Sequence, residues 1–371
     1  MKKLIINRKD LKNNLNIARK MLNSNGKDDS GNLPQIIAVV KGNGMGLGLI
    51  EYSKFLINNG INFLAVANLE EALALRKAGI TEEILMLTPF NRPKELEKLI
   101  QNNITLTISN LEQIVIVENI LKDSELEVKA HIKIDTGFAR YGFMYNNLKE
   151  ILDAFKMCLK IKICGTYTHF ARPIDDKFTK LQFDRFINCV EVLKKDGQDT
   201  GILHVSESTA FIKYPIMRLN AVRLGSFFQG RTLIKIPELI KIGTFKSEVE
   251  EIKTVPKGYN ISYGNMYKVK KQTKIAIIPV GYMDGLNMKK DRDIFSFKEN
   301  CLSVGIEIKK FFKDNRIKVE INNMKYNVIG RIGMYHCVVD ISNADNISVG
   351  DEVILNIAPM NVNSMIRREY L

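Results

Sequence analysis

The first two thirds of the chain alternate short apolar segments with longer stretches in which apolar residues recur every three or four positions. The short segments have the near-continuous apolar character of strands buried on both faces. The longer stretches, such as residues 69–78 and 180–194, have helical spacing, and Gly60 and Gly79 follow helical stretches where a left-handed cap would end the helix. About eight such β/α units over roughly 200 residues predict a parallel (β/α)8 TIM-type barrel, with a doubly wound sheet as the structural alternative. The apolar segments lie at residues 36–40, 63–67, 84–87, 104–108, 128–134, 161–166, 202–205 and 221–224.

The pattern changes near residue 235. From there on the chain contains short apolar segments separated by glycines, and no long helical period is evident. We therefore expect the barrel to occupy residues 1–235 and a mainly β domain to occupy residues 236–371. Residues 1–8 hold a short strand pattern at positions 3–7, which we expect to pair with the C-terminal domain. The later strands are expected at residues 274–280, 316–321, 326–329, 337–341 and 352–355.

The composition is that of an ordinary folded protein: of 371 residues, 45% are hydrophobic and 26% are charged. These values exclude a disordered, collagenous or coiled-coil chain. No apolar run reaches the ~18 residues of a membrane-spanning helix. The apolar stretch near the N-terminus, Leu4–Ile6, is too short for a secretory signal. We therefore expect a cytoplasmic protein without a membrane partner.

The net charge of +14 raises the question of nucleic-acid binding. The lysines are spread through helical faces, whereas a nucleic-acid binder usually concentrates them in a stripe with aromatic residues between them. We expect no nucleic-acid partner, and the charge better suits small anionic ligands. The cysteines are odd in number and lack a CxxC pair, so we expect neither a disulfide framework nor a metal site. They are expected to be buried: Cys158, Cys164, Cys189, Cys301 and Cys337.

Polar residues at the ends of the predicted barrel strands are the strongest functional signal, because the C-terminal strand ends of such a barrel surround one site. Each has an ordinary alternative: a lysine after a strand is commonly a solvated loop residue, and Asp135 with Arg140 would make a structural ion pair. Their coincidence at different strand ends favours a site. The segments are AVVKGNGMGLG with Lys41, HIKIDTGFARYGF with Lys133 and Arg140, GTYTHFARPID with His169, HVSESTA with His204 and Ser208, and AVRLGS with Arg223, Gly225 and Ser226.

Two of these features indicate a cofactor. Lys41 follows a buried strand, and a lysine whose amine is deprotonated by its surroundings forms covalent bonds with carbonyl compounds. Gly225 and Ser226 follow the last strand, where backbone N–H groups of this barrel usually bind phosphate. A reactive lysine beside a phosphate site predicts pyridoxal 5'-phosphate.

Eight segments in order resemble the alanine racemase family, the fold-type III pyridoxal phosphate racemases: AVVKGNG, KIDTGFARYGF, YTHFA, NAVRLGS, ISYGNMY, IPVGYMDG, VIGRIGM and VGDEV. The resemblance covers nearly the whole chain. It implies an isomerase that interconverts L- and D-alanine by a two-base mechanism and supplies D-alanine for peptidoglycan. It also implies a head-to-tail homodimer in which the β domain of one subunit completes the active site of the other.

The resemblance implies a role for each matching residue. Lys41 matches the lysine that binds the cofactor and acts as one base, and Tyr263 matches the base on the opposite face. Arg140 and the backbone of Met334 match contacts to the substrate carboxylate. Lys133 matches a supporting lysine that is often carbamylated, and Tyr282 matches a tyrosine of the substrate entrance. The matching cofactor contacts are His169, His204, Ser208, Arg223, Gly225 and Ser226.

Several departures from the family pattern concern the substrate pocket. Met45 and Leu47 stand where a tyrosine and a histidine are usual, Glu207 replaces an asparagine and Tyr335 an aspartate. Asn363 or Ser364 takes the place of a tyrosine that contacts phosphate. An enlarged pocket keeps serine or broad-specificity racemisation open. A non-catalytic pyridoxal phosphate-binding protein and a decarboxylase of basic amino acids are further alternatives. The region after residue 240 argues against the first, and the position of the last cysteine, Cys337, argues against the second.

Overall fold

The computed structural model describes residues 1–24, 31, 33–288, 297–311 and 316–371. The chain forms two compact units. The barrel unit is Arg8–Ile242, and the sheet unit combines Met1–Asn7 with Gly243–Leu371. The C-terminal part of the sheet unit thus begins seven residues after residue 236, where the sequence placed the start of the β domain. Residues before Gly243 stay with the barrel unit because Asn14 of the first helix exchanges two hydrogen bonds with the backbone of Ile240.

Parallel strands of the barrel unit form a closed ring, as the apolar segments predict. Two runs of paired strands, β10-β2-β3-β4 and β5-β6-β8-β9, are joined by the bridges Leu85 to Thr105 and Glu207 to Arg223. The ring closes, so the prediction of a (β/α)8 barrel is confirmed and the doubly wound sheet is wrong. The strands of the ring are β2 (Gln35–Val39), β3 (Phe63–Val66), β4 (Glu83–Met86), β5 (Leu106–Ile108), β6 (Val128–Asp135), β8 (Ile161–Tyr167), β9 (Ile202–His204) and β10 (Ala221–Leu224).

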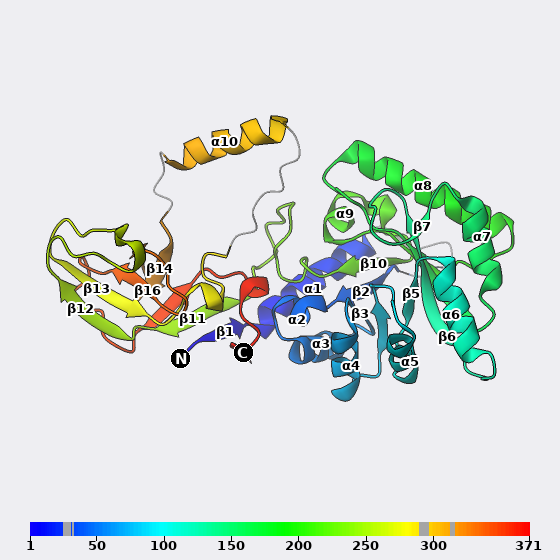
Figure 1. Ribbon diagram of the computed structural model, residues 1–371, viewed down its shortest axis with the longest axis horizontal. Coiled ribbons are helices and arrows are strands. Elements are labelled where there is room, and N and C mark those ends of the chain that lie inside the picture. The colour runs from blue at the N-terminus through cyan, green and yellow to red at the C-terminus, as the bar shows by residue number, and fades with distance from the viewer. Residues whose placement is uncertain (25–30, 32, 289–296, 312–315) are drawn as a thin grey trace. The chain divides into compact units, whose positions relative to one another are not determined.

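Helices follow the strands and cover the outside of the ring (Figure 1). Four of them begin at an Asn or Asp whose side chain accepts a backbone N–H of the first turn, a common N-cap. Gly60 and Gly79 both have φ of +80° after a helix, which confirms the expected caps. The helices are α1 (Arg8–Asn23), α3 (Leu49–Asn58), α4 (Leu69–Lys77), α5 (Pro93–Gln101), α6 (Leu111–Leu121), α7 (Leu148–Met157), α8 (Asp176–Lys195) and α9 (Ser208–Lys213); β7 (Phe143–Met144) is a short addition beside β6.

The sheet unit is built on one nine-stranded sheet among the described residues, in the order β12-β13-β16-β15-β14-β17-β11-β1-β18. The N-terminal strand pairs with β11 and β18, so residues 3–6 belong to this sheet. Three strands, β11, β12 and β18, have no counterpart among the expected segments, because their sequences TFKSE, EIKTV and RREY are rich in polar residues. The strands are β1 (Lys3–Ile6), β11 (Thr244–Glu248), β12 (Glu251–Val255), β13 (Thr273–Ile278), β14 (Lys318–Ile321), β15 (Met324–Ile329), β16 (Cys337–Asp340), β17 (Glu352–Leu355) and β18 (Arg367–Tyr370).

Two expectations for the C-terminal region and the cysteines need correction. The region contains a helix, α10 (Phe297–Phe311), although no long helical period was expected there. Four of its apolar side chains, Phe297, Leu302, Val304 and Ile308, are exposed, so no single buried face marks the helix in the sequence. The expectation of buried cysteines is wrong for Cys301, which is exposed on this helix, whereas Cys189 and Cys337 are buried.

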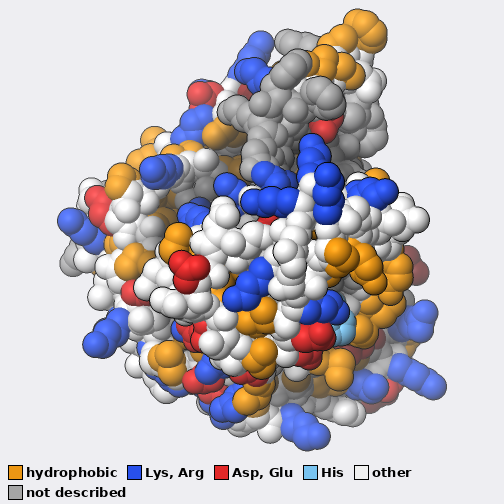
Figure 2. All heavy atoms as spheres, turned by 90° about the vertical axis from the view of Figure 1, so that its left-hand side faces the viewer, with side chains coloured by type: hydrophobic (Ala, Val, Ile, Leu, Met, Phe, Trp, Pro, Cys, Tyr) orange, Lys and Arg blue, Asp and Glu red, His pale blue; other side chains and the backbone are white. Residues whose placement is uncertain are grey.

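Three features bear on possible partners and metals: the distribution of surface charge, the apolar character of the helices and the grouping of metal-ligating side chains. Figure 2 shows lysine and arginine side chains spread over the visible face, with aspartate and glutamate side chains among them. None of the helices in the described residues combines the length and the apolar character needed to cross a membrane. Among the same residues, no three His, Cys, Asp or Glu side chains are grouped so as to hold a metal ion.

Candidate active site

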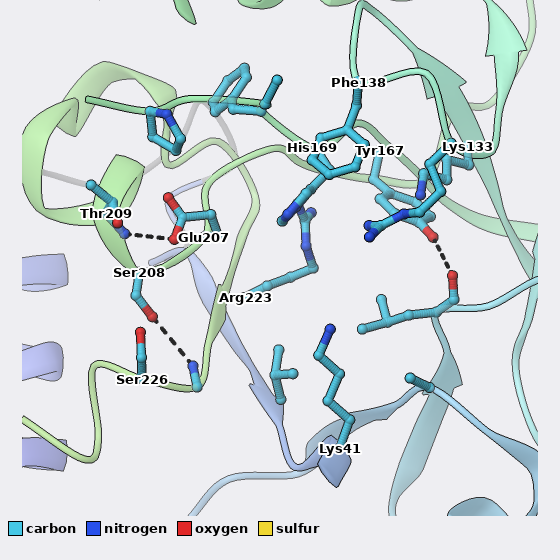
Figure 3. A pocket seen from close by; sticks show the side chains of 18 of the residues that line it. Lys41, Lys133, Phe138, Tyr167, His169, Glu207, Ser208, Thr209, Arg223 and Ser226 are labelled. Atoms are coloured by element: carbon cyan, nitrogen blue, oxygen red, sulfur yellow. Dashed lines mark hydrogen bonds between the residues drawn. The ribbon is translucent and has the colours of Figure 1, made fainter. Parts of the chain in front are cut away.

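A cavity of about 590 Å³ lies at the C-terminal ends of the barrel strands. Basic side chains and histidine, serine and glutamate side chains reach it from the ends of β2, β6, β8 and β9 and from β10 itself (Figure 3). The structure therefore brings together residues that are up to 185 positions apart in the chain, from 41 to 226. The cavity is lined by most of the expected barrel residues: Lys41, Lys133, Arg140, His169, Ser208, Arg223, Gly225 and Ser226.

Lys41 extends into this cavity from an unusual turn. The segment α2 (Lys41–Met45) follows β2 directly, and its residues Gly42 to Met45 all have positive φ. The turn aims the Lys41 side chain toward Arg223 (Figure 3). Burial, the charge of Arg140 and the charge of Arg223 lower the pKa of Lys41, although Glu71 acts in the opposite direction. A larger fraction of Lys41 is therefore neutral than for a solvated lysine.

Arg223 is fixed by hydrogen bonds to backbone carbonyl groups. Its Nη1 donates to the oxygen of His204 at 2.8 Å, and its Nη2 donates to the oxygens of Thr168 at 2.8 Å and Val205 at 3.0 Å. Burial lowers the pKa of Arg223 to about 10, which leaves it charged at neutral pH. The guanidinium is thus a rigid, protonated donor beside the cavity.

Two buried histidines extend this arrangement away from the cavity. Arg223 Nη1 donates to Nδ1 of His204 at 2.6 Å, and Nε2 of His204 lies 2.8 Å from Nδ1 of His131. Burial and then Arg223 lower both pKa values, to about 3 for His131, so both rings are neutral. Because Arg223 can only donate, the hydrogen bonds assign the protons to Nε2 of both rings. His204 does not line the cavity itself, and it also stacks on Tyr167 with ring centroids 4.7 Å apart.

The loop after β6 shapes the other side of the cavity. Burial raises the pKa of Asp135, but backbone N–H groups from Gly137 to Arg140 bond its carboxylate and lower the pKa overall. Asp135 therefore organises the turn that presents Arg140, and it does so through backbone N–H groups; the ion pair considered from the sequence is not the observed contact. Lys133 is buried, and burial with the charges of Arg140 and Arg223 lowers its pKa to about 7.

The third side of the cavity is formed by the loop after β10 and the start of α9. Ser208 Oγ accepts the N–H groups of Gly225 at 3.4 Å and Phe227 at 3.2 Å, which holds the loop after β10 against α9. Glu207 caps α9 by accepting the N–H groups of Thr209 and Ala210 (Figure 3).

The charges of the lining residues agree with an anionic ligand. They include the cations Lys41, Lys133, Arg140 and Arg223 against the single carboxylate of Glu207. A ligand that carries a phosphate and reacts with an amine fits this donor set.

The expected residues of the sheet unit form a cluster of their own. Tyr282 N–H donates to the oxygen of Gly333, and Met283 N–H donates to the oxygen of Met334. Tyr263 belongs to the same cluster, since its ring lies 3.7 Å from the position that a Cβ on Gly333 would take. The side chains are open to solvent, with exposed fractions of 71% for Tyr263, 45% for Tyr282 and 49% for Met334.

Sequence reasoning missed three residues that support the barrel site: His131, Tyr167 and Glu71. His131 lies inside the expected apolar segment 128–134, where a polar residue that interrupts the run was the available signal. Tyr167 is the last residue of β8, one position after the expected segment 161–166, and no signal marked it. Glu71 lies in the first turn of α4, where an acidic residue is common for helix stability alone, so no signal distinguished it.

A barrel that presents a lysine of lowered pKa, together with further basic side chains, at its strand ends fits the class of barrel-type pyridoxal phosphate enzymes. Residues 6–232 match the sequence model described as "Alanine racemase, N-terminal domain", and residues 242–367 match "Alanine racemase, C-terminal domain". The chain belongs to the alanine racemase family, whose members are pyridoxal phosphate enzymes.

Individual alanine racemases are similar to this chain over most of its length. An alanine racemase of Methanococcus maripaludis is 34% identical over 351 residues, covering 92% of this chain and 85% of the relative. The structure of alanine racemase from Clostridium difficile 630 superposes with a TM-score of 0.84 at 28% identity, covering 100% of this chain and 95% of that one. The Bacillus anthracis enzyme with bound L-Ala-P gives a TM-score of 0.79 at 26% identity, covering 95% and 85%.

Proposed function

We propose that this protein interconverts L- and D-alanine, with Lys41 and Tyr263 as the two bases. The observation that carries the proposal is the position of Lys41, whose pKa is lowered in a cavity with Arg140 and the buried Arg223. Racemisation removes a proton from one face of Cα and returns one to the other face, so two bases on opposite sides are expected. The L-Ala-P bound to the Bacillus anthracis relative supports an alanine-like substrate.

When bound, pyridoxal phosphate supplies an electron-withdrawing ring that stabilises negative charge at the Cα of an attached amino acid. The neutral amine of Lys41 accepts the proton on its face, and its ammonium form returns one. Arg223 provides a hydrogen-bond donor that keeps its proton at neutral pH. Arg140, presented by the Asp135 turn, offers a positive charge to the substrate carboxylate, together with the backbone of Met334. Gly225, Ser226 and Ser208 would hold the phosphate.

Tyr263 is the better candidate for the second base than the buried tyrosine of the barrel cavity. Burial raises the pKa of Tyr167 to about 12, and its hydroxyl bonds Thr107 at 3.0 Å, so it is a poor proton acceptor. Tyr263 has an exposed side chain and lies beside Met334 and Tyr282 in the sheet unit.

We further propose a head-to-tail homodimer in which the sheet unit of one subunit completes the barrel cavity of the other. The exposed cluster of Tyr263, Tyr282 and Met334 supports this, because a large apolar surface at a proposed site calls for a covering partner. A two-fold arrangement closes without open ends.

Lys133 is proposed to be carbamylated. Only a neutral amine adds to CO2, and a lysine whose pKa is about 7 is partly neutral at physiological pH. The carbamate would carry a negative charge and balance Arg140. Mass spectrometry of the intact protein in bicarbonate and in CO2-free buffer tests this.

The role in the cell is proposed to be the supply of D-alanine for peptidoglycan, in the cytoplasm. The five cysteines are unpaired, which supports a reducing compartment.

The experiment that tests the activity incubates the purified protein and cofactor with each L-amino acid and separates the enantiomers by chiral chromatography. We expect D-alanine to form fastest. Faster formation of D-serine would favour the serine racemase alternative. A bound cofactor without any D-amino acid would indicate a non-catalytic protein, and release of CO2 would indicate a decarboxylase.

A further inference from the structure

The turn after Lys41 has a backbone conformation that residues with side chains avoid. Gly42, Asn43, Gly44 and Met45 have φ of 67°, 55°, 65° and 55°, so four consecutive residues form a left-handed turn. L-residues such as Asn43 and Met45 are strained in this region, and such strain persists only where surrounding contacts hold it. Gly44 is also close to its neighbours, because a Cβ there would lie 3.2 Å from the backbone of Leu49.

Side chains from outside the turn hold this conformation. Oε1 of Glu71 accepts the N–H of Asn43 at 2.9 Å, and the side-chain amide of Gln229 donates to the carbonyl oxygen of Met45. Glu71 is itself placed by α4, since its N–H donates to the N-cap side chain of Asn68 at 2.8 Å. One residue thus connects the first turn of α4 to the turn that carries Lys41.

The second carboxylate oxygen of Glu71 has no role in this clamp. Within the described residues, Oε2 is buried and has no hydrogen-bond partner. A buried carboxylate oxygen without a partner is unfavourable unless a positive charge compensates it. The charge of Glu71 acts favourably on the Lys41 ammonium, whereas Arg140 and Arg223 repel that ammonium. Lys133 also faces Lys41, and the neighbouring His169 is neutral because burial holds its pKa well below the usual value.

We propose that Glu71 is a positioning residue for Lys41: its Oε1 fixes the left-handed turn through Asn43, and its second carboxylate oxygen, buried without a partner, supplies a negative charge beside that turn. The inference deepens the proposed function and rests on it for the purpose of the lysine. The contact between Glu71 and the turn, and the effect of Glu71 on the Lys41 amine, do not depend on the cofactor and can be measured in the cofactor-free protein.

Three variants separate the two effects. Glu71→Gln keeps an oxygen that accepts the Asn43 N–H but removes the charge. Glu71→Ala removes both. Glu70→Gln is the matched control, because Glu70 is the adjacent acidic residue of the same helical turn and is exposed.

The primary readout is the reaction of Lys41 with trinitrobenzenesulfonate in the cofactor-free protein, measured against pH and located by peptide mapping. A neutral amine is the reactive form. We expect Glu71→Gln to shift the Lys41 profile to lower pH by about half a unit or more, which makes labelling near pH 7 about threefold faster. Glu70→Gln should match the wild type. Glu71→Ala should show the same shift together with slower covalent loading by pyridoxal phosphate, followed by absorbance, because the turn is released.

A Glu71→Gln profile that superimposes on that of the wild type would overturn the role of the charge, as would an equal shift in Glu70→Gln. If Glu71→Gln does not fold, judged by thermal unfolding, Glu71→Asp replaces it. This variant keeps the charge on a shorter side chain, so its labelling profile should stay at the wild-type pH while cofactor loading slows; a shift to lower pH would overturn the proposal. If the wild type binds no pyridoxal phosphate, the proposed function fails, but the labelling profile still decides the role of Glu71.

Discussion

The guanidinium of Arg223 and the imidazole of His204 share a 2.6 Å hydrogen bond inside the barrel. Both groups are buried, and the second nitrogen of His204 continues the chain to His131. Arg223 has no acceptor atom and must donate to Nδ1 of His204. His204 therefore carries its proton on Nε2 and donates it to Nδ1 of His131, whose own proton is then on Nε2. Two of the side chains that hold Arg223 in place, His204 directly and His131 through His204, do not themselves line the cavity.

We predict that His131→Phe lowers the free energy of unfolding by about 1–3 kcal/mol, because it leaves the buried Nε2–H of His204 without an acceptor. Urea unfolding of the cofactor-free protein measures the change. Gly165→Ala is a companion variant, since its Cβ would lie 2.7 Å from the His131 ring and displace it. Unchanged unfolding midpoints in both variants would contradict the importance of this chain.

We predict that pyridoxal phosphate binds covalently through Lys41. Absorbance of the linkage should disappear on borohydride treatment, and peptide mapping should find the reduced cofactor on Lys41. Lys133 is the alternative, because its pKa of about 7 also makes it nucleophilic. Lys133→Gln should keep the linkage and Lys41→Ala should lose it; a label on any other lysine rejects the assignment.

We predict that Tyr263→Phe impairs proton transfer at one face of Cα far more than at the other, by about 100-fold or more, while the cofactor stays bound. Exchange of the Cα hydrogen in D2O, followed separately from L- and D-alanine, measures each face. Tyr282→Phe, in the same cluster, is the control and should reduce both directions alike. Equal losses from the two enantiomers in Tyr263→Phe would count against the assignment of faces.

We predict that mixing inactive Lys41→Ala and Tyr263→Phe proteins restores activity. In a dimer with shared sites, a mixed pair has one site with both substitutions and one intact site, so up to about half the sites of each mixed dimer recover. Differently tagged subunits verify the exchange. Recovery should be absent if each chain carries a whole site, and absence after proven exchange ends the shared-site proposal.

We predict that Lys133 makes the protein less stable at low pH. Its pKa is about 7 in the folded protein against 10.5 in the unfolded chain, so between these values the unfolded chain binds more protons. Stability therefore rises with pH across this window, by at most about 1.4 kcal/mol per pH unit for one group. The free energy of unfolding, measured at pH 7, 8 and 9 in CO2-free buffer, should rise less steeply in Lys133→Met. Parallel curves for the two proteins would contradict the lowered pKa.

The barrel was predictable because of how its strands are buried. Strands covered on both faces are nearly all apolar. Segments such as residues 63–67 and 221–224 can therefore be predicted as strands from the local sequence alone, without knowing which strands pair with them. Parallel strands also bring their C-terminal ends to one rim, and this places Lys41, His169 and Arg223 around one cavity. The sheet unit was less predictable, since β12 and β18 carry polar residues on exposed faces and resemble loops in the sequence.

The sequence by itself determined the ring of strands, the residues at its rim and the family, because local apolar patterns and short motifs carry that information. Only the tertiary structure decided how these residues are held. His131 meets His204 from 73 positions away, and Glu71 meets Asn43 from 28 positions away, through contacts that depend on strand register and helix packing. Neither partner is marked locally: a histidine in an apolar strand and a glutamate in a first helical turn are ordinary residues until the fold closes around them.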